Sequence, residues 1–415
     1  MVFARVIIGD SRKMMEPDES VDLIVTSPPY WYIKDYGVKG QIGYGQSLHD
    51  YLKSLYLVWK ECFRVLKPGA RLCINIGDQF LRSIIYGVYK IVPLHSEFVI
   101  QCEKLGFDYM GSIIWQKRTT MNTTGGANVM GSYPFPPNGL IEIDYEFILI
   151  LKKPGKKLAF SEEVKEKSKL TKEEWKEYFS GHWAFHGERQ VGHEAMFPEE
   201  LPKRLIKMFT FINDTVLDPF LGSGTTIKAA LNLNRNSVGY EINEKFLPII
   251  KKKMATTQNQ MSFDAKIEII KRDLSIEIED VANYASSIKD IKPKINPQLF
   301  RFKKDKLYIV KSHNEDTMEL DTGLVVKLLG IEIKHGRRND AKRYLENFVK
   351  GKQIFLKFDP IYKPEGNTVY AYVFLKNGIF VNKEMIKQGL ADIQEKDFIY
   401  KNTFVNVKRL SNEQC

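Results

Sequence analysis

Short β-rich apolar runs alternate with amphipathic stretches from residue 3 to about residue 255. This alternation is typical of an α/β domain with a mostly parallel sheet. In such sheets ligands gather at the carboxyl ends of the strands, so the turns at those ends are where a site is expected. The expected strands are Val21–Thr26, Ala70–Ile76, Tyr109–Gln116, Tyr145–Lys152, Thr215–Asp218 and Ser237–Glu241, and the expected helices are Ser47–Val65, Phe197–Phe209, Ser223–Asn232 and Lys245–Met254.

A second domain is expected beyond the proline- and lysine-containing stretch Asp290–Pro297. The pattern there changes to alternating strands, expected at Gly323–Ile331, Gln353–Asp359 and Val369–Leu375. From Lys294 to Cys415 there are 23 Lys and Arg against 15 Asp and Glu, a net charge of 23 − 15 = +8. This domain is therefore predicted to be basic.

The whole chain of 415 residues carries 62 Lys and Arg and 51 Asp and Glu, a net charge of +11. This excess favours a polyanionic partner, nucleic acid before membrane. The four cysteines (Cys62, Cys73, Cys102 and Cys415) lack the spacing of a disulfide scaffold or a zinc ribbon. No apolar run approaches the roughly 18 residues of a membrane span, and the first residues lack a signal peptide's layout. We therefore expect a cytoplasmic, nucleoid-associated protein.

The most specific motif, Thr26-Ser27-Pro28-Pro29-Tyr30-Trp31, follows the apolar run that ends at Val25. Two prolines stop the strand and fix the backbone, which leaves carbonyl groups and the Ser27 hydroxyl as rigid hydrogen-bond acceptors. The ring of Tyr30 could stack on a planar base. Taken alone, the motif also fits a simple strand-ending turn.

A second motif, Asp218-Pro219-Phe220-Leu-Gly222-Ser223-Gly224-Thr225, reads as a strand, a glycine-rich turn and the start of a helix. Glycines allow close backbone approach to a ligand, and a helix N-terminus offers free N–H groups. The next strand ends in Glu241-Ile-Asn243, where a carboxylate could hold ribose hydroxyls. The glycine-rich turn and this carboxylate together predict a nucleoside-cofactor site, with a purely structural turn as the alternative. The spacing is not that of a P-loop.

In this order, the two motifs resemble those of the beta-type amino DNA methyltransferases, which methylate cytosine N4 or adenine N6. The resemblance covers roughly residues 3–255 and includes Ile8-Gly9-Asp10, Val65-Leu-Lys-Pro-Gly69 and His193-Glu-Ala-Met-Phe-Pro198. It implies a Rossmann-like fold dependent on S-adenosyl-L-methionine, with a mixed, mostly parallel seven-stranded sheet over residues 1–260. It also implies double-stranded DNA as the substrate, a restriction–modification system with a cognate endonuclease, and a monomer or homodimer.

The resemblance also assigns roles to individual residues. The catalytic group would be Ser27, Pro28, Pro29 and Tyr30. Asp10 would hold the adenine amino group, Glu241 the ribose hydroxyls, and Phe197-Pro198 the methionine end. The full set of expected cofactor contacts is Asp10, Phe197, Pro198, Asp218, Pro219, Phe220, Gly222, Ser223, Gly224, Thr225, Glu241 and Asn243.

The chemistry expected is direct attack of an exocyclic amino nitrogen on the sulfonium methyl group. Hydrogen bonds from that amino group to Ser27 and to the Pro28 carbonyl would favour its nucleophilic form. Methylation at cytosine C5 needs a cysteine that follows proline, and none of the four cysteines does. In the family that the chain resembles, Ser at the first position of the motif more often accompanies methylation of cytosine N4, and Asp that of adenine N6. The resemblance therefore implies cytosine N4 as the target, with adenine N6 as the alternative.

The target base must leave the duplex, and Tyr30 and Trp31 are candidates for holding it. Residues 117–190 are expected to hold insertions that recognise the target sequence. There Lys117, Arg118, Asn122 and Asn128 have side chains suited to bases or phosphates, although each could equally be a solvated loop residue. No metal site is predicted, because His182, His186 and His193 lack a fourth ligand.

Residues 299–411, beyond a linker at 261–298, resemble a staphylococcal-nuclease-type (OB-like) β-barrel. The resemblance rests on segments such as Asn314-Glu-Asp316-Thr317 and Val326-Lys-Leu-Leu-Gly-Ile-Glu332. Asp316 and Glu332 match acidic positions, but Lys327, His335 and Thr368 stand at or near the positions of the essential arginines and glutamate. We therefore expect a DNA-binding barrel without nuclease activity. A bifunctional methyltransferase–nuclease, a non-catalytic DNA-binding protein, and an RNA or protein methyltransferase are the alternatives.

Overall fold

The computed structural model divides the chain into two compact units. The N-terminal unit comprises Met1–Phe80 and Ile91–Asp290, and the C-terminal unit comprises Leu81–Lys90 and Ile291–Cys415. In the described part of the chain, no helix is both long and apolar enough to cross a membrane. The structure describes residues 2–32, 36–38, 40–81, 86, 90–117, 137, 141, 143–157, 160–185, 198–260, 265–273, 281, 284–291, 307–321, 323–360, 362 and 368–412.

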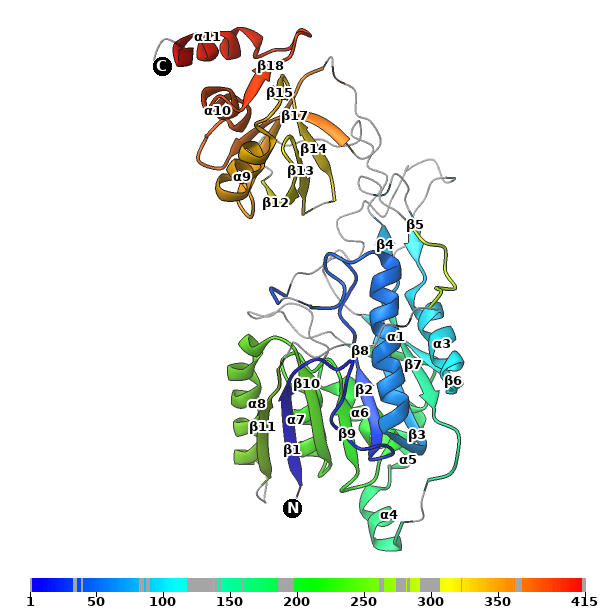
Figure 1. Ribbon diagram of the computed structural model, residues 1–415. Coiled ribbons are helices and arrows are strands. Elements are labelled where there is room, and N and C mark those ends of the chain that lie inside the picture. The colour runs from blue at the N-terminus through cyan, green and yellow to red at the C-terminus, as the bar shows by residue number, and fades with distance from the viewer. Residues whose placement is uncertain are drawn as a thin grey trace. The chain divides into compact units, whose positions relative to one another are not determined.

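A mixed sheet forms the centre of the N-terminal unit, with the order β11-β1-β10-β9-β2-β3-β7-β6-β8 among the described residues (Figure 1). The six strands from β11 to β3 pair in parallel, whereas β7 runs antiparallel to both β3 and β6. The strands are β1 (Phe3–Ile8), β2 (Val21–Thr26), β3 (Leu66–Ile76), β6 (Asp108–Lys117), β7 (Tyr145–Lys152), β8 (His182–Phe185), β9 (Thr215–Asp218), β10 (Asn236–Glu241) and β11 (Lys266–Lys271).

The sheet is wider than the seven strands expected. The strand β11 lies in the range 261–298 that was assigned to a linker, yet its residues pair with β1 from Phe3 to Ile8. The short strand β8 pairs with β6 at the other edge. Both β7 and β8 also lie within 117–190, so part of the range expected to hold recognition insertions belongs to the scaffold.

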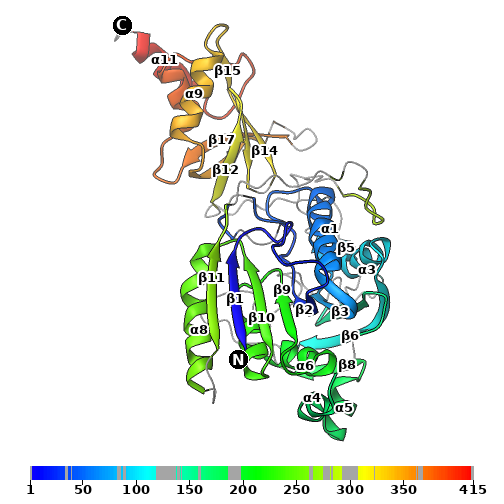
Figure 2. The ribbon, with the colours of Figure 1, turned by 60° about the horizontal axis from the view of Figure 1, so that its bottom comes forward.

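Helices cover both faces of this sheet (Figures 1 and 2). On one face lie α6 (Glu200–Phe209), α7 (Thr225–Asn232) and α8 (Leu247–Gln260), and on the other lie α1 (Leu48–Val65) and α3 (Leu94–Lys104). Apolar side chains of α6 and α7 pack against those of β2 and β9 to form one core cluster. Among the residues that the structure describes, this unit also contains α4 (Glu162–Ser168), α5 (Lys172–Tyr178) and the 3₁₀ turn η2 (Glu244–Phe246).

The described residues of the C-terminal unit contain a closed five-stranded barrel with the order β12-β13-β14-β17-β16. The strand expected at Gly323–Ile331 is broken in two by a turn at Gly330, whose φ of 82° favours glycine. The elements are β12 (Tyr308–His313), β13 (Thr317–Leu320), β14 (Val325–Leu328), β15 (Ile331–Ile333), α9 (Arg338–Phe348), β16 (Gln353–Phe358), β17 (Thr368–Leu375), α10 (Val381–Lys387), β18 (Ala391–Ile393) and α11 (Lys401–Asn412). A separate short sheet pairs β4 (Gln79–Leu81) with β5 (Lys90–Val92).

Candidate active site

Four adjacent parallel strands, β1, β10, β9 and β2, end around one cavity of about 800 Å³ that opens to solvent. A site was expected in the turns at the carboxyl ends of the strands, and Ser27 and Pro29 of the diproline motif line this cavity together with Gly222 of the glycine-rich turn. The lining residues that follow the four strands are Gly9, Asp10, Ser11, Ser27, Pro29, Pro219, Phe220, Gly222, Ser223, Glu241 and Ile242.

A buried carboxylate joins the two motifs. Asp218 has no exposed surface and accepts hydrogen bonds from the hydroxyl of Thr26 at 2.8 Å and from the hydroxyl of Thr226 at 2.6 Å. The backbone N–H of Phe220 donates to it at 3.0 Å. Burial raises the pKa of Asp218 to about 6, although these hydrogen bonds favour its ionised form. Through these hydrogen bonds Asp218 fixes the positions of the two turns. It is not among the residues that line the cavity, where a cofactor contact was expected.

The glycine-rich turn is held by a second carboxylate, that of Glu241 at the end of β10. Glu241 accepts the backbone N–H groups of Gly222 and Asn243, each at 2.8 Å, and also lines the cavity. Burial raises its pKa to about 7. A carboxylate has about four acceptor positions, so two hydrogen bonds leave capacity for hydroxyl groups of a ligand.

Gly222 has a φ of 54°, a conformation that glycine adopts without strain. A Cβ atom there would meet nothing closer than the carbonyl of Phe220 at 4.0 Å, so open space lies beside the backbone. Helix α7 begins at Thr225, two residues later than expected. Ser223 and Thr225 accept hydrogen bonds from the ammonium group of Lys253 at 2.8 and 3.0 Å.

Asp10 lines the cavity, but its carboxylate also binds the guanidinium of Arg12, with Nε 3.0 Å from both oxygens. Arg12 in turn donates to the carbonyl of Gly40. Asn243 does not line the cavity; its side-chain amide donates to the carbonyl of Tyr36 at 2.8 Å. Tyr36 lines the cavity, so Asn243 helps to shape the cavity by holding the backbone at Tyr36.

The diproline turn is rigid in the structure. Pro28 is buried, and the hydroxyl of Tyr51 donates to the carbonyl of Pro29 at 3.0 Å. Tyr30 follows, and its hydroxyl donates to the carboxylate of Glu146 on β7 at 2.6 Å. Burial and the nearby carboxylate of Glu146 hold the pKa of Tyr30 well above its usual range. Tyr30 is therefore a neutral donor with a fixed ring.

Glu146 was not singled out from the sequence. Its buried carboxylate also accepts the side-chain amide of Asn75 at 2.6 Å and pairs with the ammonium group of Lys117. Three elements far apart in the chain thus meet at one acidic group beside the diproline motif. One sequence feature could have pointed to Glu146: it is an acidic residue near the start of an otherwise apolar run, Tyr145-Glu-Phe-Ile-Leu-Ile-Leu151.

One residue expected to contact DNA is placed elsewhere. Trp31 is only 2% exposed, and its indole N–H donates to the carbonyl of Gln46 at 2.9 Å, so the ring packs in the core and cannot hold a base. Lys117 is partly exposed with its ammonium group on Glu146. Pro198 is buried beside the start of α6 and does not line the cavity. The expectations for Phe197, Arg118, Asn122 and Asn128 fall outside the described residues.

In the barrel, the two acidic residues that match the nuclease pattern are not joined in a metal-binding group. Asp316 pairs with the ammonium group of Lys327 at 3.4 Å, and Glu332 lies on β15 opposite Asp392 of β18. No group of three or more His, Cys, Asp or Glu side chains suited to a metal occurs among the residues that the structure describes.

The chain was compared with known proteins. Residues 21–252 match the DNA methylase family. The Type II methyltransferase M.MjaI of Methanocaldococcus jannaschii is 40% identical over 65% of this chain and 96% of its own length. M.MthZI of Methanothermobacter thermautotrophicus, also a Type II methyltransferase, is 32% identical over 66% of this chain and 81% of its own. Among solved structures, TTHA0409 of Thermus thermophilus, named as a DNA modification methylase and complexed with S-adenosyl-L-methionine, is 35% identical with a TM-score of 0.51. It covers 63% of this chain and 98% of its own.

The cavity fits the cofactor that these relatives indicate. It has open space beside Gly222 for close backbone approach, and a carboxylate, Glu241, with free acceptor capacity for hydroxyl groups of a ligand. The cofactor is S-adenosyl-L-methionine. With a family match that covers more than half of its length, the chain belongs to the N6/N4 DNA methylase family and is a DNA methyltransferase.

Proposed function

We propose that this protein transfers a methyl group to the exocyclic N4 of cytosine in double-stranded DNA, as the modification enzyme of a restriction–modification system with a cognate endonuclease. The observation that carries the proposal is that Ser27 and Pro29 line the same cavity as Phe220, Gly222 and Glu241. Acceptors for an amino group thus lie next to the cofactor-binding turn. Adenine N6 is the second candidate, because its amino group offers the same hydrogen-bond donors.

The roles of the residues follow from this arrangement. When bound, S-adenosyl-L-methionine supplies an electrophilic methyl group on a positively charged sulfur. Ser27 and the backbone of Pro28 would accept the hydrogens of the base's amino group, which orients the nitrogen lone pair toward the methyl group. Tyr30, fixed by Glu146, would stack on the base after it leaves the duplex. Catalysis would come from positioning, with no covalent enzyme intermediate.

The cofactor would be held mainly by the turn at Phe220–Ser223 and by Glu241. The backbone of Gly222 would approach the ligand closely, and Glu241 would accept hydrogen bonds from the ribose hydroxyls. Asp10 would share its carboxylate between Arg12 and the adenine amino group. These assignments are supported by the lining of the cavity.

The test is to express the chain in a host that lacks DNA methylation and to sequence the methylome. N4-methylcytosine in a fixed sequence context is the expected result. If N6-methyladenine is found, the target is adenine N6 and the enzyme class is unchanged. An unmodified genome together with methylated RNA or protein would overturn the proposal.

For the C-terminal unit we propose a staphylococcal-nuclease-like barrel that binds DNA without cleaving it. The ion pair between Asp316 and Lys327 supports this, because a cation already occupies the carboxylate that would hold a metal. Plasmid should stay intact during long incubation with calcium or magnesium. Cleavage that disappears in the Asp316→Ala variant would instead support a bifunctional enzyme.

A further inference from the structure

A shallow hollow, wide open to solvent, lies beside helix α9 in the C-terminal unit. It does not include Asp316 or Glu332, so it is separate from the residues that resemble a nuclease site. Ala341 and Leu345 of α9 are buried in the core of the unit, which leaves the neighbouring side chains of the helix to form the wall. The hollow is lined by Arg337, Asp340, Arg343, Tyr344, Asn347, Phe348, Gln388 and Leu390.

Two stacked aromatic rings stand in this wall, and we call this pair, Tyr344 and Phe348, the platform. Tyr344 and Phe348 stand one helical turn apart, and their rings stack with centroids 4.9 Å apart at an angle of 28°. Phe348 is 52% exposed, although phenylalanine is usually buried. The ammonium group of Lys352 lies 5.7 Å from the centre of its ring. An exposed ring with an ammonium group over it is suited to a planar ligand that carries negative charge, which can stack on the ring and attract the ammonium group.

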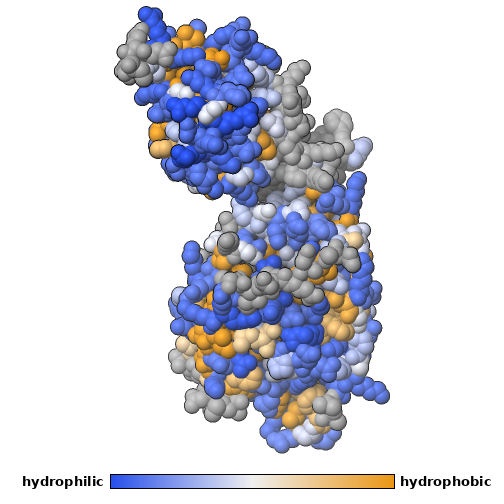
Figure 3. Space-filling view, viewed as in Figure 1, coloured by the Kyte–Doolittle hydropathy of each residue, from blue (hydrophilic) through white to orange (hydrophobic). Residues whose placement is uncertain are grey.

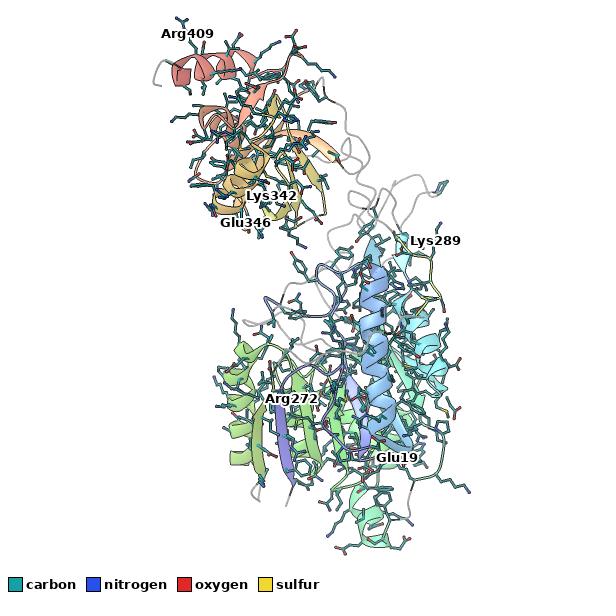
Figure 4. All side chains as sticks on the ribbon, in the orientation of Figure 1. Glu19, Arg272, Lys289, Lys342, Glu346 and Arg409 are labelled. Atoms are coloured by element: carbon teal, nitrogen blue, oxygen red, sulfur yellow. The ribbon has the colours of Figure 1, made fainter. Side chains whose placement is uncertain are left out.

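Residues 334–352, named here the α9 surface, concentrate the positive charge of the unit. They hold seven Lys and Arg against two acidic residues, a net charge of 7 − 2 = +5. Asp340 lies between Arg337, at 2.8 Å, and Arg343, at 3.9 Å, so it holds two guanidinium groups at the hollow. The only other acidic side chain of the segment, Glu346, pairs with Lys350 and His313. Figure 3 shows mostly hydrophilic residues over this helix, and Figure 4 shows Lys342 and Glu346 on it.

We propose that the α9 surface binds single-stranded DNA, with an unpaired base stacked on the Tyr344–Phe348 platform and the phosphates beside Arg337 and Arg343. Only an unpaired base can reach the face of a surface ring, because bases in a duplex are already stacked on one another. Asn347 and Gln388 supply amide groups for the edge of the base. The choice of DNA over other nucleic acids rests on the proposed function. The evidence for the platform and its charge is independent of that function.

The test measures binding of the full-length chain to a fluorescent single-stranded 12-nucleotide oligodeoxythymidine by anisotropy. The Phe348→Ala/Tyr344→Ala double variant should bind about tenfold or more weakly, since one stacked base contributes roughly 1–3 kcal/mol. Phe348→Trp, which keeps a ring, should retain the affinity. Arg337→Gln/Arg343→Gln should lower the slope of log Kd against log salt by about 1.4, at about 0.7 per phosphate contact.

The chain provides a matched control on α5 and its C-cap. There Trp175, 58% exposed, and Phe179, 42% exposed, stack with centroids 4.5 Å apart, but their surroundings include Glu173, Glu174 and Glu177. Trp175→Ala/Phe179→Ala should leave binding to the oligonucleotide unchanged. An equal loss in this control would contradict a specific role for the α9 platform.

Three further results would overturn the proposal: unchanged affinity of the Phe348→Ala/Tyr344→Ala variant, an equal loss with a duplex of the same length, or equally effective displacement by polyglutamate. The last would indicate an acidic protein partner. Methyl transfer by the same preparations is measured in parallel. If a platform variant methylates normally and binds the oligonucleotide like the parent, only the proposed role of the α9 surface is refuted. If the unaltered chain does not methylate DNA, the proposed function is refuted.

Discussion

The carboxylate of Glu146 should be one of the costliest side chains to remove from the N-terminal unit. Its side chain is 7% exposed and accepts donors from Tyr30, Asn75 and Lys117. Removing one member of a buried ion pair typically costs about 3–5 kcal/mol of unfolding free energy, because the remaining charge stays buried. Lys117 keeps 31% of its side chain exposed and can turn toward water. We therefore expect Glu146→Ala to lower the free energy of unfolding by about 3 kcal/mol, at the lower end of that range.

Glu146→Gln should be milder, with a loss of about 1–2 kcal/mol. The amide can still accept the Tyr30 hydroxyl, and its NH₂ group needs an acceptor. Asn75 can supply one, because its Oδ1 is buried without a hydrogen-bond partner among the described residues, and a flipped amide would point that oxygen at the new donor. We therefore expect the Glu146→Ala variant to be less stable than the Glu146→Gln variant.

Urea denaturation followed by tryptophan fluorescence is a clean assay for this unit. All five tryptophans of the chain belong to the N-terminal unit, so the signal does not report on the barrel; they are Trp31, Trp59, Trp115, Trp175 and Trp183. Glu163→Ala is the control, since Glu163 pairs with Lys167 in solvent on α4 and should leave the transition unchanged. A Glu146→Ala variant that unfolds within about 1 kcal/mol of the parent would refute the reasoning on buried charge.

Four other outcomes follow from the site. Ser27→Ala should slow methyl transfer by about tenfold or more, the cost of one lost transition-state hydrogen bond, with cofactor affinity by calorimetry unchanged; weakened cofactor binding would contradict its role toward the base. Gly222→Val should abolish cofactor binding, because a branched side chain would fill the open space and strain a φ of 54°, and a normal titration would argue against this turn as the binding site. Burial raises the pKa of Glu241 to about 7, and its ionised form accepts hydroxyl groups more strongly than its protonated form, so the apparent Kd for the cofactor should rise by up to about tenfold at pH 6 relative to pH 8; a flat profile, or one that Glu241→Gln does not flatten, would contradict this. Deletion of residues 298–415 should weaken DNA binding and its salt dependence more than cofactor affinity, measured by anisotropy and calorimetry, and equal losses in both would indicate that the truncated chain is damaged.

The sequence was sufficient for the features that depend on local pattern. The strands that end at Thr26 and Asp218 are apolar runs closed by prolines, and the strand that ends at Glu241 runs into the polar segment that begins at Asn243, so their ends and the common edge of the sheet could be predicted. The strand β11 was missed because lysines flank it and a glutamate interrupts it, which reads as a solvated segment. Its position at an edge of the sheet explains why charged residues are tolerated there.

Contacts between distant residues could not be predicted in the same way. Tyr30 and Glu146 are 116 positions apart, and no spacing rule connects them. Trp31 directly follows Tyr30 of the diproline motif, but the backbone turns its ring into the core. Asp218 matches the cofactor motif, yet three donors from the protein itself surround its carboxylate. In each case the tertiary packing decides the role of the side chain.

The link from Thr26 through Asp218 to Thr226 has a consequence for how the enzyme can change. On the proposed function, one acid group holds both the turn that would face the base and the turn that would face the methyl donor. We expect a shift of either turn to move the other with it, so that new sequence preferences can arise in the surrounding loops while the distance between methyl donor and acceptor is kept.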